Sequence, residues 1–408
     1  MTSPYQHRKS STRLRLTGPD GQPLAGREAT VRMTSHEFLF GTAEFEVLPY
    51  CNGELSGAEK ELLEARLALS FDLFNAITLP FYWGRFEPAE GAPDTQRMKQ
   101  AAQWLKAKGK VLKGHPLCWH TVCAPWLLEK SNEEIMDIQL KRIARDTQEF
   151  AGLIDMWDVI NEVVIMPRFD RYDNAITRLC KQVGRIPLVR SVFEAAKAAV
   201  PGAALLINDF DTSWSYDILL EGLLEAGVPI DAIGIQSHMH QGYWGVEKTQ
   251  EILARFGQFG LPLHFTETSL VSGDIMPSEI EDLNDFKHNG WSTTPDGEAR
   301  QALEVETHFR TLFADPNTVS ATYWHIEDGH WLDAPSGLLR KDASAKPAYN
   351  VLYRLIKEEW WTPAATLCTD ADGCVTVEGY RGDYAVEMGG SSAAFKLVKG
   401  RETTAVTL

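Results

Sequence analysis

Residues 204–240 read ALLINDFDTSWSYDILLEGLLEAGVPIDAIGIQSHMH, and this stretch sets the architecture of the chain. It opens with the apolar run Ala204–Asp211 and closes with a second apolar run, Asp231–His240. Near-continuous apolar runs are typical of parallel strands that are buried on both faces. Two such runs joined by a helix-length amphipathic segment predict a βαβ unit within a parallel sheet.

The same alternation continues from about residue 38 to residue 360. Its strand candidates are Phe38–Ala43, Asn75–Phe81, Val111–His120, Asp155–Glu162, Ala204–Asp211, Asp231–His240, Pro262–Ser269 and Ser320–Asp328. Amphipathic runs separate them: Glu298–Asp315 stops at a proline, and Asp94–Gly109 ends in a glycine that suits a helix C-terminus. Eight strands that alternate with helices predict a (β/α)8 TIM barrel, an α/β fold. A doubly wound open sheet is the alternative on periodicity alone, but it normally has a glycine-rich first turn, which this sequence lacks.

The two flanks of this region carry shorter, alternating patterns. Thr12–Met33 holds two candidate strands around the turn sequence Gly18-Pro19-Asp20-Gly21-Gln22-Pro23, and Ala364–Leu408 holds several more between glycine-rich turns. Because neither flank alone can bury a core, we expect them to pair into a small β-sandwich beside the barrel. The expected division is residues 1–36 for the N-terminal strands of this sandwich, 37–361 for the barrel and 362–408 for the C-terminal strands.

Charge and composition narrow the range of partners. The formal net charge of −16 opposes binding to nucleic acid and to anionic membrane surfaces, and it is compatible with a neutral substrate such as a polysaccharide. The 12 tryptophans exceed what a core of this size needs, and the flat C–H faces of sugar rings pack well on indoles. We therefore expect a carbohydrate ligand, and we expect no cofactor.

Membrane and export signals are weak. No run of about 18 apolar residues is present, so we expect no transmembrane helix, and Met1 to Arg15 lacks the apolar segment of a signal peptide.

The six cysteines show no framework spacing. Cys368 and Cys374 flank a short turn and would face each other across a hairpin, so the sequence leaves open whether they form a disulfide. Cys118-x-His120-x-x-Cys123 has metal-like spacing, but it straddles a predicted strand end, and buried free thiols are the better interpretation.

Two glutamates stand at the carboxyl ends of predicted strands, where barrels of this kind place their functional groups. The fourth strand ends in WDVINE (157–162) and the seventh in HFTE (264–267), so Glu162 and Glu267 converge on one mouth. Retaining glycoside hydrolysis needs two carboxyls about 5–5.5 Å apart, one protonated and one ionised. Repulsion between them would keep Glu162 protonated until Glu267 is consumed as an ester. We therefore predict Glu162 as the acid/base and Glu267 as the nucleophile of a retaining β-glycosidase, although a lone glutamate at such a place more often caps a helix.

Five motifs in order resemble the strand motifs of family 10 glycoside hydrolases, which are mainly endo-β-1,4-xylanases. They are Gly114-His115-Pro116-Leu117-Cys118-Trp119-His120, Trp157–Glu162, Asn208-Asp209-Phe210, Gly234-Ile235-Gln236-Ser237-His238 and Phe265-Thr266-Glu267. The resemblance runs through about residues 38–360 and implies the same two catalytic glutamates.

The resemblance also implies a set of substrate-binding residues around the glutamates: His115, Trp119, Asn161, Asn208, Gln236, His238, Trp324 and Trp331. Asn161 would hydrogen-bond the 2-hydroxyl of the sugar at the cleavage point, and His115 its 3-hydroxyl. Gln236 and His238 would contact the nucleophile region, while the three tryptophans would wall the sugar in. A turn-capping role for Asn208 and a packing role for Trp331 are the alternatives.

The sequence departs from the family pattern in the loop after the second strand. The family usually carries a Glu-Asn pair and a lysine there, which grip the second sugar on the glycone side. This chain has Leu79-Pro80-Phe81-Tyr82-Trp83-Gly84-Arg85 instead. Tyr82, Trp83 and Arg85 are candidates for a rebuilt subsite, although Phe81 and Trp83 fit a core position equally well.

Two further departures lie near the glutamates. The family normally has an aspartate two residues beyond the nucleophile, where this chain has Ser269. A serine cannot stabilise a protonated imidazole as a carboxylate does, so we expect His238 to be neutral more of the time and to support an ionised Glu267 less strongly. Phe210 replaces a common tyrosine and removes a hydroxyl near the leaving-group side.

Two rival functions are weighed against the glycosidase. His115, His120, His238, His240 and Asp328 near strand ends resemble the ligands of a metal-dependent hydrolase, but such barrels usually place a His-x-His pair on the first strand, which has none here. A catalytically weak carbohydrate-binding barrel is the second rival, although binding alone does not require both glutamates.

The substrate expected from the resemblance is β-1,4-linked xylan or xylo-oligosaccharides. A different or decorated β-linked oligosaccharide is the alternative, because the polar grip on the second glycone sugar is lost. A polymeric substrate would favour a secreted or periplasmic location.

Overall fold

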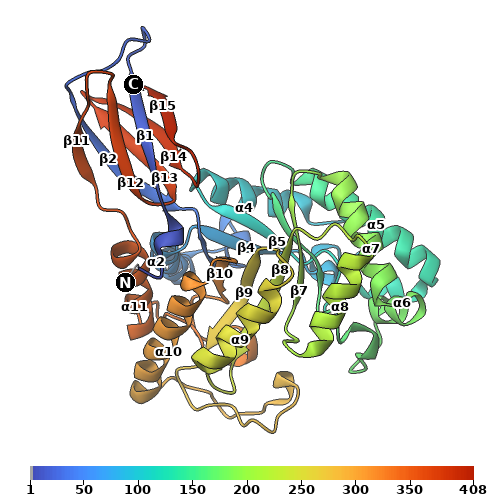
Figure 1. Cartoon of the computed structure of the whole chain (residues 1–408). Coiled ribbons are helices and arrows are strands. Elements are labelled where there is room, and N and C mark those ends of the chain that lie inside the picture. Colours follow the sequence, from blue (N-terminus) through green and yellow to red (C-terminus); the bar gives the residue numbers. More distant parts are fainter. Residues whose placement is uncertain (1–2) are drawn as a thin grey trace.

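The computed structural model describes residues 3–408, and a closed barrel of parallel strands forms its larger part (Figure 1). The barrel strands are β3 (Leu39–Ala43), β4 (Ala76–Pro80), β5 (Val111–His115), β6 (Met156–Asn161), β7 (Ala204–Asp209), β8 (Ala232–Met239), β9 (Leu263–Leu270) and β10 (Thr318–Tyr323). Their order is β10-β3-β4-β5-β6-β7-β8-β9, and β10 pairs with both β9 and β3. The predicted (β/α)8 TIM barrel is therefore confirmed, and the open-sheet alternative is wrong.

Two predicted strands end several residues earlier in the structure than the sequence predicted. In the run Val111–His120 the regular strand ends at His115, because Pro116 has no N–H to donate to a strand ladder, and an isolated bridge between Cys118 and Ile160 follows. The run Ser320–Asp328 leaves the sheet after Tyr323, and His325 adopts a φ of 62°, which breaks the extended backbone. Both early endings free motif side chains from the barrel wall and place them at its mouth.

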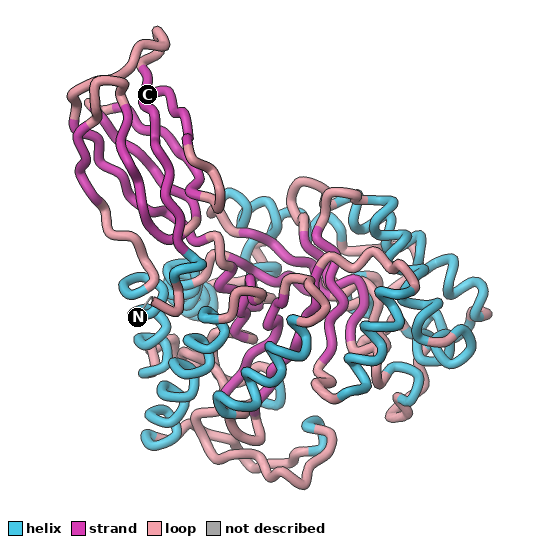
Figure 2. The backbone as a smooth tube through the Cα atoms, viewed as in Figure 1, coloured by secondary structure: helices cyan, strands magenta, loops and turns pink. Residues whose placement is uncertain are grey.

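Helices surround the strands on the outside of the barrel (Figure 2). Their bounds are α1 (Val47–Cys51), α2 (Gly57–Leu73), α3 (Trp83–Phe86), α4 (Thr95–Ala107), α5 (Asn132–Glu149), α6 (Ala175–Val183), α7 (Arg185–Ala199), α8 (Trp214–Glu225), α9 (Gly245–Gly257), α10 (Pro295–Ala314) and α11 (Pro347–Arg354). Thr294 caps α10 by accepting the N–H of Gly297, and Val305 and Phe309 bury the inner face of that helix. Within residues 3–408 no helix combines the length and the apolar character that crossing a membrane requires.

The terminal strands form two extra sheets that project from one end of the barrel (Figure 1). One sheet has the order β12-β1-β15 and the other the order β11-β2-β13-β14. Their strands are β1 (Lys9–Thr17), β2 (Glu28–His36), β11 (Ala365–Cys368), β12 (Cys374–Tyr380), β13 (Gly382–Met388), β14 (Ser391–Leu397) and β15 (Thr403–Thr407). The expected pairing of the two flanks is confirmed, since β1 and β2 pair with C-terminal strands and lie in different sheets.

The accessory sheets attach beside the amino ends of β3 and β10, away from the strand ends that form the mouth. Arg8 donates from its guanidinium to the carbonyls of Phe313, Asp315 and Thr318, at 3.1, 2.5 and 2.6 Å. The stacked rings of Phe313 and Trp360, with centroids 4.2 Å apart, close the junction. The division of the chain into residues 1–36, 37–361 and 362–408 stays a prediction, because it concerns which parts fold independently.

The open question of a disulfide is answered by the sheet topology. Cys368 ends β11 beside β2, whereas Cys374 begins β12 beside β1, so the two residues belong to different sheets rather than to one hairpin. Both thiols are free, as are those of Cys118 and Cys123.

Candidate active site

The carboxyl ends of β6 and β9 bring Glu162 and Glu267 to the same mouth. Glu162 follows β6 directly with a left-handed φ of 56°, and its N–H donates to the carbonyl of Asn208 at 2.8 Å. A non-glycine residue in this region of backbone space costs of order 1–3 kcal/mol and is found mainly at functional sites. Glu267 lies within β9, and only 6% of its side chain is exposed, against 16% for Glu162.

Glu267 is held as an ionised carboxylate. Its Oε1 accepts a hydrogen bond from Asn208 at 2.9 Å, and its Oε2 lies 3.1 Å from Nε2 of His238. His115 Nε2 is 3.8 Å from Oε1. Burial would raise the pKa of Glu267, but His115, His238 and Lys113 more than offset burial and lower that pKa below its ordinary value. The group therefore has the charge that a nucleophile needs.

The pKa of Glu162 is displaced in the opposite direction. Burial is the main cause, and the charges of Glu267 and Asp209 add to it, so that the pKa of Glu162 rises to about 8. The indole N–H of Trp119 donates to Oε2 at 2.8 Å and Gln236 donates to Oε1 at 3.3 Å, which limits the rise. At neutral pH Glu162 holds a proton that it can donate.

Three amide side chains link the two carboxyls across β6, β7 and β8. The Oδ1 atom of Asn161 accepts from Asn208 at 2.8 Å and from Gln236 at 3.1 Å. Asn208 is completely buried and also accepts from Thr266 at 2.6 Å, so it positions Glu267 rather than capping a turn. Gln236 stands opposite Glu267 in the β8–β9 register, but its amide donates to the acid/base side. The expected contact of Gln236 with the nucleophile region stays a prediction, and its hydrogen bond to Glu162 is an addition to it.

A buried ion pair lies behind His115. Nδ1 of His115 is 2.8 Å from Oδ2 of Asp158, which is also 2.8 Å from the ammonium of Lys113. Because Asp158 accepts the proton on Nδ1, His115 turns its other nitrogen towards Glu267. Sequence reasoning missed Asp158 and Lys113 as positioning residues, although Lys113 stands two residues before His115 and Asp158 three residues before Asn161, each on the same strand.

Aromatic rings line the mouth on the side of β3, β4 and β10. The ring of Tyr82 lies 5.5 Å from that of Trp119 and 5.8 Å from that of Phe45, and Phe45 in turn is 5.8 Å from Trp324. Trp331 packs against His238 at 4.6 Å. The pKa of Tyr82 is raised well above its ordinary value, first by burial and then by the charge of Glu267. Phe45 was missed because nothing in its local pattern marks it.

The candidates of the loop after β4 separate into two groups. The exposed Arg85 lies 5.6 Å over the ring of Tyr82, so both residues stand at the mouth. Trp83 is 3% exposed, donates to Glu87 at 3.1 Å and packs under Arg142, so its expected part in a sugar subsite is wrong. Phe81 is fully buried as well. The loop and helix α3 bury Phe81, Trp83 and Phe86 and leave Arg85 exposed, which the sequence alone left open.

The remaining sequence candidates are also placed. Ser269 Oγ lies 2.9 Å from Nδ1 of His238, where the family aspartate is expected, and Phe210 is 48% exposed at the end of β7. Among residues 3–408, three side chains that could ligate a metal ion lie close together: Glu46, His325 and His330. The residues that suggested a metal-dependent hydrolase do not join this group.

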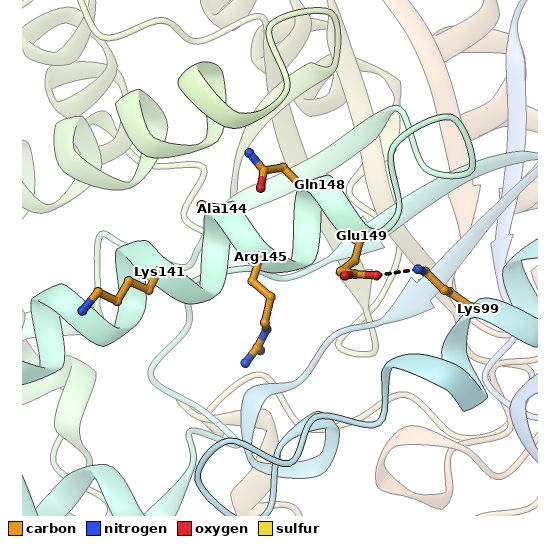
Figure 3. Close-up of a pocket in the computed structure, with 6 residues that line it drawn as sticks. All are labelled: Lys99, Lys141, Ala144, Arg145, Gln148 and Glu149. Atoms are coloured by element: carbon orange, nitrogen blue, oxygen red, sulfur yellow. Dashed lines mark hydrogen bonds and ion pairs between the residues drawn. The ribbon is translucent and has the colours of Figure 1, made fainter.

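A separate hollow lies on the outer wall of the barrel between α4 and α5 (Figure 3). It is lined by Lys99, Lys141, Ala144, Arg145, Gln148 and Glu149. Lys99 pairs with Glu149 at 2.5 Å, and Arg145 is already engaged by Glu87 at 2.9 Å. Lys141 pairs with Asp137, so each charged group of the lining already has an ion-pair partner, and we place the chemistry at the strand ends instead.

Comparison with known proteins agrees with the motifs. The model of glycosyl hydrolase family 10 matches residues 59–355. The chain belongs to this family. An endo-1,4-beta-xylanase of Geobacillus stearothermophilus is 29% identical over 290 residues, which cover 66% of this chain and 83% of that protein. Endo-1,4-beta-xylanase C of Paenibacillus barcinonensis is 26% identical over 68% of this chain.

Family 10 members differ widely in length. This chain spans 28% of the P. barcinonensis protein and 42% of an endo-1,4-beta-xylanase/feruloyl esterase of Xylanibacter ruminicola. Among solved structures, a family 10 enzyme from P. barcinonensis superposes with a TM-score of 0.64 at 22% identity, over 80% of this chain and 96% of that one. Native xylanase 10B from Thermotoga maritima gives 0.64 at 20% identity, over 79% and 96%. These similarities show that the fold is shared.

Proposed function

We propose that this family 10 chain is a retaining glycoside hydrolase that cleaves β-1,4-linked xylan or xylo-oligosaccharides by double displacement. One observation carries the proposal: two buried glutamates in one mouth have pKa values displaced in opposite directions, Glu162 to about 8 and Glu267 below its ordinary value. Such a split assigns the acid and the nucleophile, because each group is in the protonation state that its role requires.

In the first step a carboxylate oxygen of Glu267 attacks the anomeric carbon, and the bond to the leaving oxygen breaks. Glu162 transfers its proton to that oxygen, so the aglycone departs as an alcohol. The product is a glycosyl ester on Glu267. Once this ester forms, the negative charge of Glu267 is gone and the ionised Glu162 is left beside a neutral group.

In the second step Glu162 accepts a proton from water, and the resulting oxygen nucleophile attacks the anomeric carbon from the face that the aglycone left. The bond to Glu267 breaks, and its carboxylate returns to the hydrogen bond of Asn208 and to His238. Two inversions restore the β-configuration. The amides of Asn161, Asn208 and Gln236 keep both carboxyls oriented throughout, which avoids reorganisation in the transition state.

The choice of xylan rests on the relatives, whose names describe endo-1,4-beta-xylanases, and on the site. The aromatic rings of Tyr82, Trp119 and Trp324 offer flat surfaces for sugar rings. The net charge of −16 suits a neutral polymer. A polymeric substrate would also favour a secreted or periplasmic location.

A decorated or different β-linked oligosaccharide is the second candidate substrate. Arg85 and Tyr82 stand where the family usually carries its polar grip on the second glycone sugar, so the chain recognises that sugar with a guanidinium and a phenol. This pair would suit a sugar that carries a carboxylate or another acceptor, whereas plain xylose would gain mainly ring packing.

The test is a panel of defined β-linked oligosaccharides, with the anomeric configuration of the first product followed by NMR. We expect hydrolysis of xylo-oligosaccharides with initial release of the β-anomer. Release of the α-anomer would overturn the retaining mechanism. Cleavage of decorated oligosaccharides alone would replace the substrate and keep the mechanism. Absence of turnover on every substrate, including an activated aryl β-glycoside, would favour the carbohydrate-binding alternative.

A further inference from the structure

A second cluster of titratable side chains lies where the barrel closes, between the loops that follow β3 and β10. We define the closing cluster as Glu46, His325, His330 and Glu327. Glu46 stands three residues beyond the end of β3, and the other three follow β10. The proposed hydrolysis uses none of these four groups, and the resemblance to family 10 implied no role for them.

Three of these residues present ligand atoms to one point. One atom each of Glu46, His325 and His330 lies within 4.8 Å of the other two. Nδ1 of His330 is 3.6 Å from Oε1 of Glu46, too far for a hydrogen bond. Two ligands about 2.1 Å from one ion stand roughly 3.4 Å apart at the tetrahedral angle, so this spacing suits a shared ion.

The fourth residue fixes the orientation of His330. Nε2 of His330 lies 2.7 Å from Oε1 of Glu327, which itself accepts from Arg66 at 2.7 Å. An imidazole that donates Nε2–H to a carboxylate leaves its Nδ1 lone pair free, and this nitrogen is the one that faces Glu46. Such a carboxylate–histidine pair is the usual support of a metal-ligating histidine.

His325 supplies an independent indication of a ligand. Its side chain is 6% exposed, and its Nδ1 is buried without a hydrogen-bond partner among residues 3–408. A buried imidazole nitrogen without a partner costs free energy unless something occupies it.

The charges around the cluster also suit a cation. Glu327 accepts from the guanidinium of Arg66 at 2.7 Å, and Glu46 adds a second carboxylate beside the two imidazoles. Two histidine nitrogens and one carboxylate are the ligand set of borderline divalent ions, whereas Mg²⁺ and Ca²⁺ prefer oxygen ligands.

We propose that Glu46, His325 and His330 bind one divalent transition-metal ion of the Zn²⁺ type, with Glu327 supporting His330 and a fourth position left to water. The two imidazole rings stack with centroids 3.9 Å apart and an angle of 8° between their planes. Because parallel rings cannot both direct their in-plane lone pairs at one ion, binding tilts the more exposed ring, that of His330, out of the stack while it keeps its hydrogen bond to Glu327. The ion then joins the loops after β3 and β10 next to Trp324, and it stabilises the closure of the barrel.

The test titrates the tag-free, chelator-treated enzyme with ZnCl2 in a calorimeter. We expect one site that Mg²⁺ does not compete for, and an affinity that falls by at least about tenfold in His330→Ala and in Glu46→Gln. Affinity should rise with pH, because protons compete with the ion for the histidine nitrogens. Thermal unfolding should shift upward with Zn²⁺ in the wild-type chain but not in the two cluster variants.

The matched control is His288→Ala, since His288 bonds to the carbonyl of Leu332 at 3.0 Å, packs beside Phe286 and Trp291, and lies outside the cluster. We expect this variant to bind Zn²⁺ as the wild type does. Equal affinity in the wild type and in both cluster variants would overturn the proposal, because the ion would then bind elsewhere, for instance at an exposed thiol. Absence of stoichiometric binding to the folded wild type would overturn it as well. Both readouts are independent of glycoside hydrolysis.

Discussion

The ends of β6 and β9 each offer one glutamate to the same mouth, yet the two environments differ in what they place around the carboxyl. The surroundings of Glu267 include two imidazoles and, farther away, the ammonium of Lys113. The surroundings of Glu162 include a neutral indole, a neutral amide and the carboxyls of Glu267 and Asp209. Identical side chains thus acquire opposite protonation states from their neighbours, and the neighbours rather than the glutamates determine which one is the acid.

Removing the carboxyl of Glu267, in β9, should cause the largest loss of activity. We expect Glu267→Ala to lose more than about 10⁴-fold in kcat on every substrate, including activated aryl glycosides, because no covalent intermediate can form. Azide added to this variant should give the α-glycosyl azide by a single inversion. A β-configured azide product would contradict the assignment of Glu267 as nucleophile.

The loss of activity on removing the carboxyl of Glu162, which follows β6, should depend on the leaving group of the substrate. We expect Glu162→Ala to lose about 10²–10⁴-fold on xylo-oligosaccharides, since protonation of the leaving oxygen is lost. Aryl glycosides with acidic leaving groups should form the glycosyl ester at a rate much closer to that of the wild type. Steady-state and pre-steady-state rates across a leaving-group series measure this difference, and an equal loss on all substrates would argue against the acid role.

The hydrogen bond from Trp119 to Glu162 offers a finer test of the acid side. The indole N–H stabilises the ionised carboxylate, so Trp119→Phe should raise the pKa of Glu162 above about 8. Activity requires the protonated acid and is lost as pH rises through this pKa, so the alkaline limb should move to higher pH by roughly one unit. Trp104→Phe on α4, far from the mouth, is the matched control and should leave the limb in place. A limb that moves to lower pH would refute the assignment.

Variants of Ser269, which contacts His238, test the surroundings of Glu267. They should cause a smaller change in activity than the substitutions of Glu267, Glu162 and Trp119. An aspartate at position 269 would favour the protonated imidazole, which in turn would lower the pKa of Glu267. Activity requires ionised Glu267, so Ser269→Asp should move the acidic limb of the kcat/KM profile to lower pH by less than about one unit. Ser269→Ala should leave it almost unchanged. An unmoved limb in the aspartate variant would contradict the proposed part of His238.

Much of this protein follows from the sequence alone. The buried apolar runs, each followed by a helical segment, predicted the barrel, because a parallel sheet needs such crossovers. Glu162 and Glu267 stood at the ends of two of these runs, and the rule that strands present their function at the carboxyl end was enough to place them in one mouth. The pairing of the two flanks was also predictable, since neither could bury a core by itself.

Other features were decided by the tertiary structure. Trp83 and Tyr82 are neighbours in a loop without periodicity, and only the turn of α3 sends one into the core and the other to the mouth. Cys368 and Cys374 are close in sequence but belong to different sheets, because their strands pair with β2 and β1. The closing cluster joins residue 46 to residues 325–330, which meet only when β10 closes on β3. Local patterns determine which residues form a strand and where it ends, whereas contacts between distant segments depend on how the sheet closes.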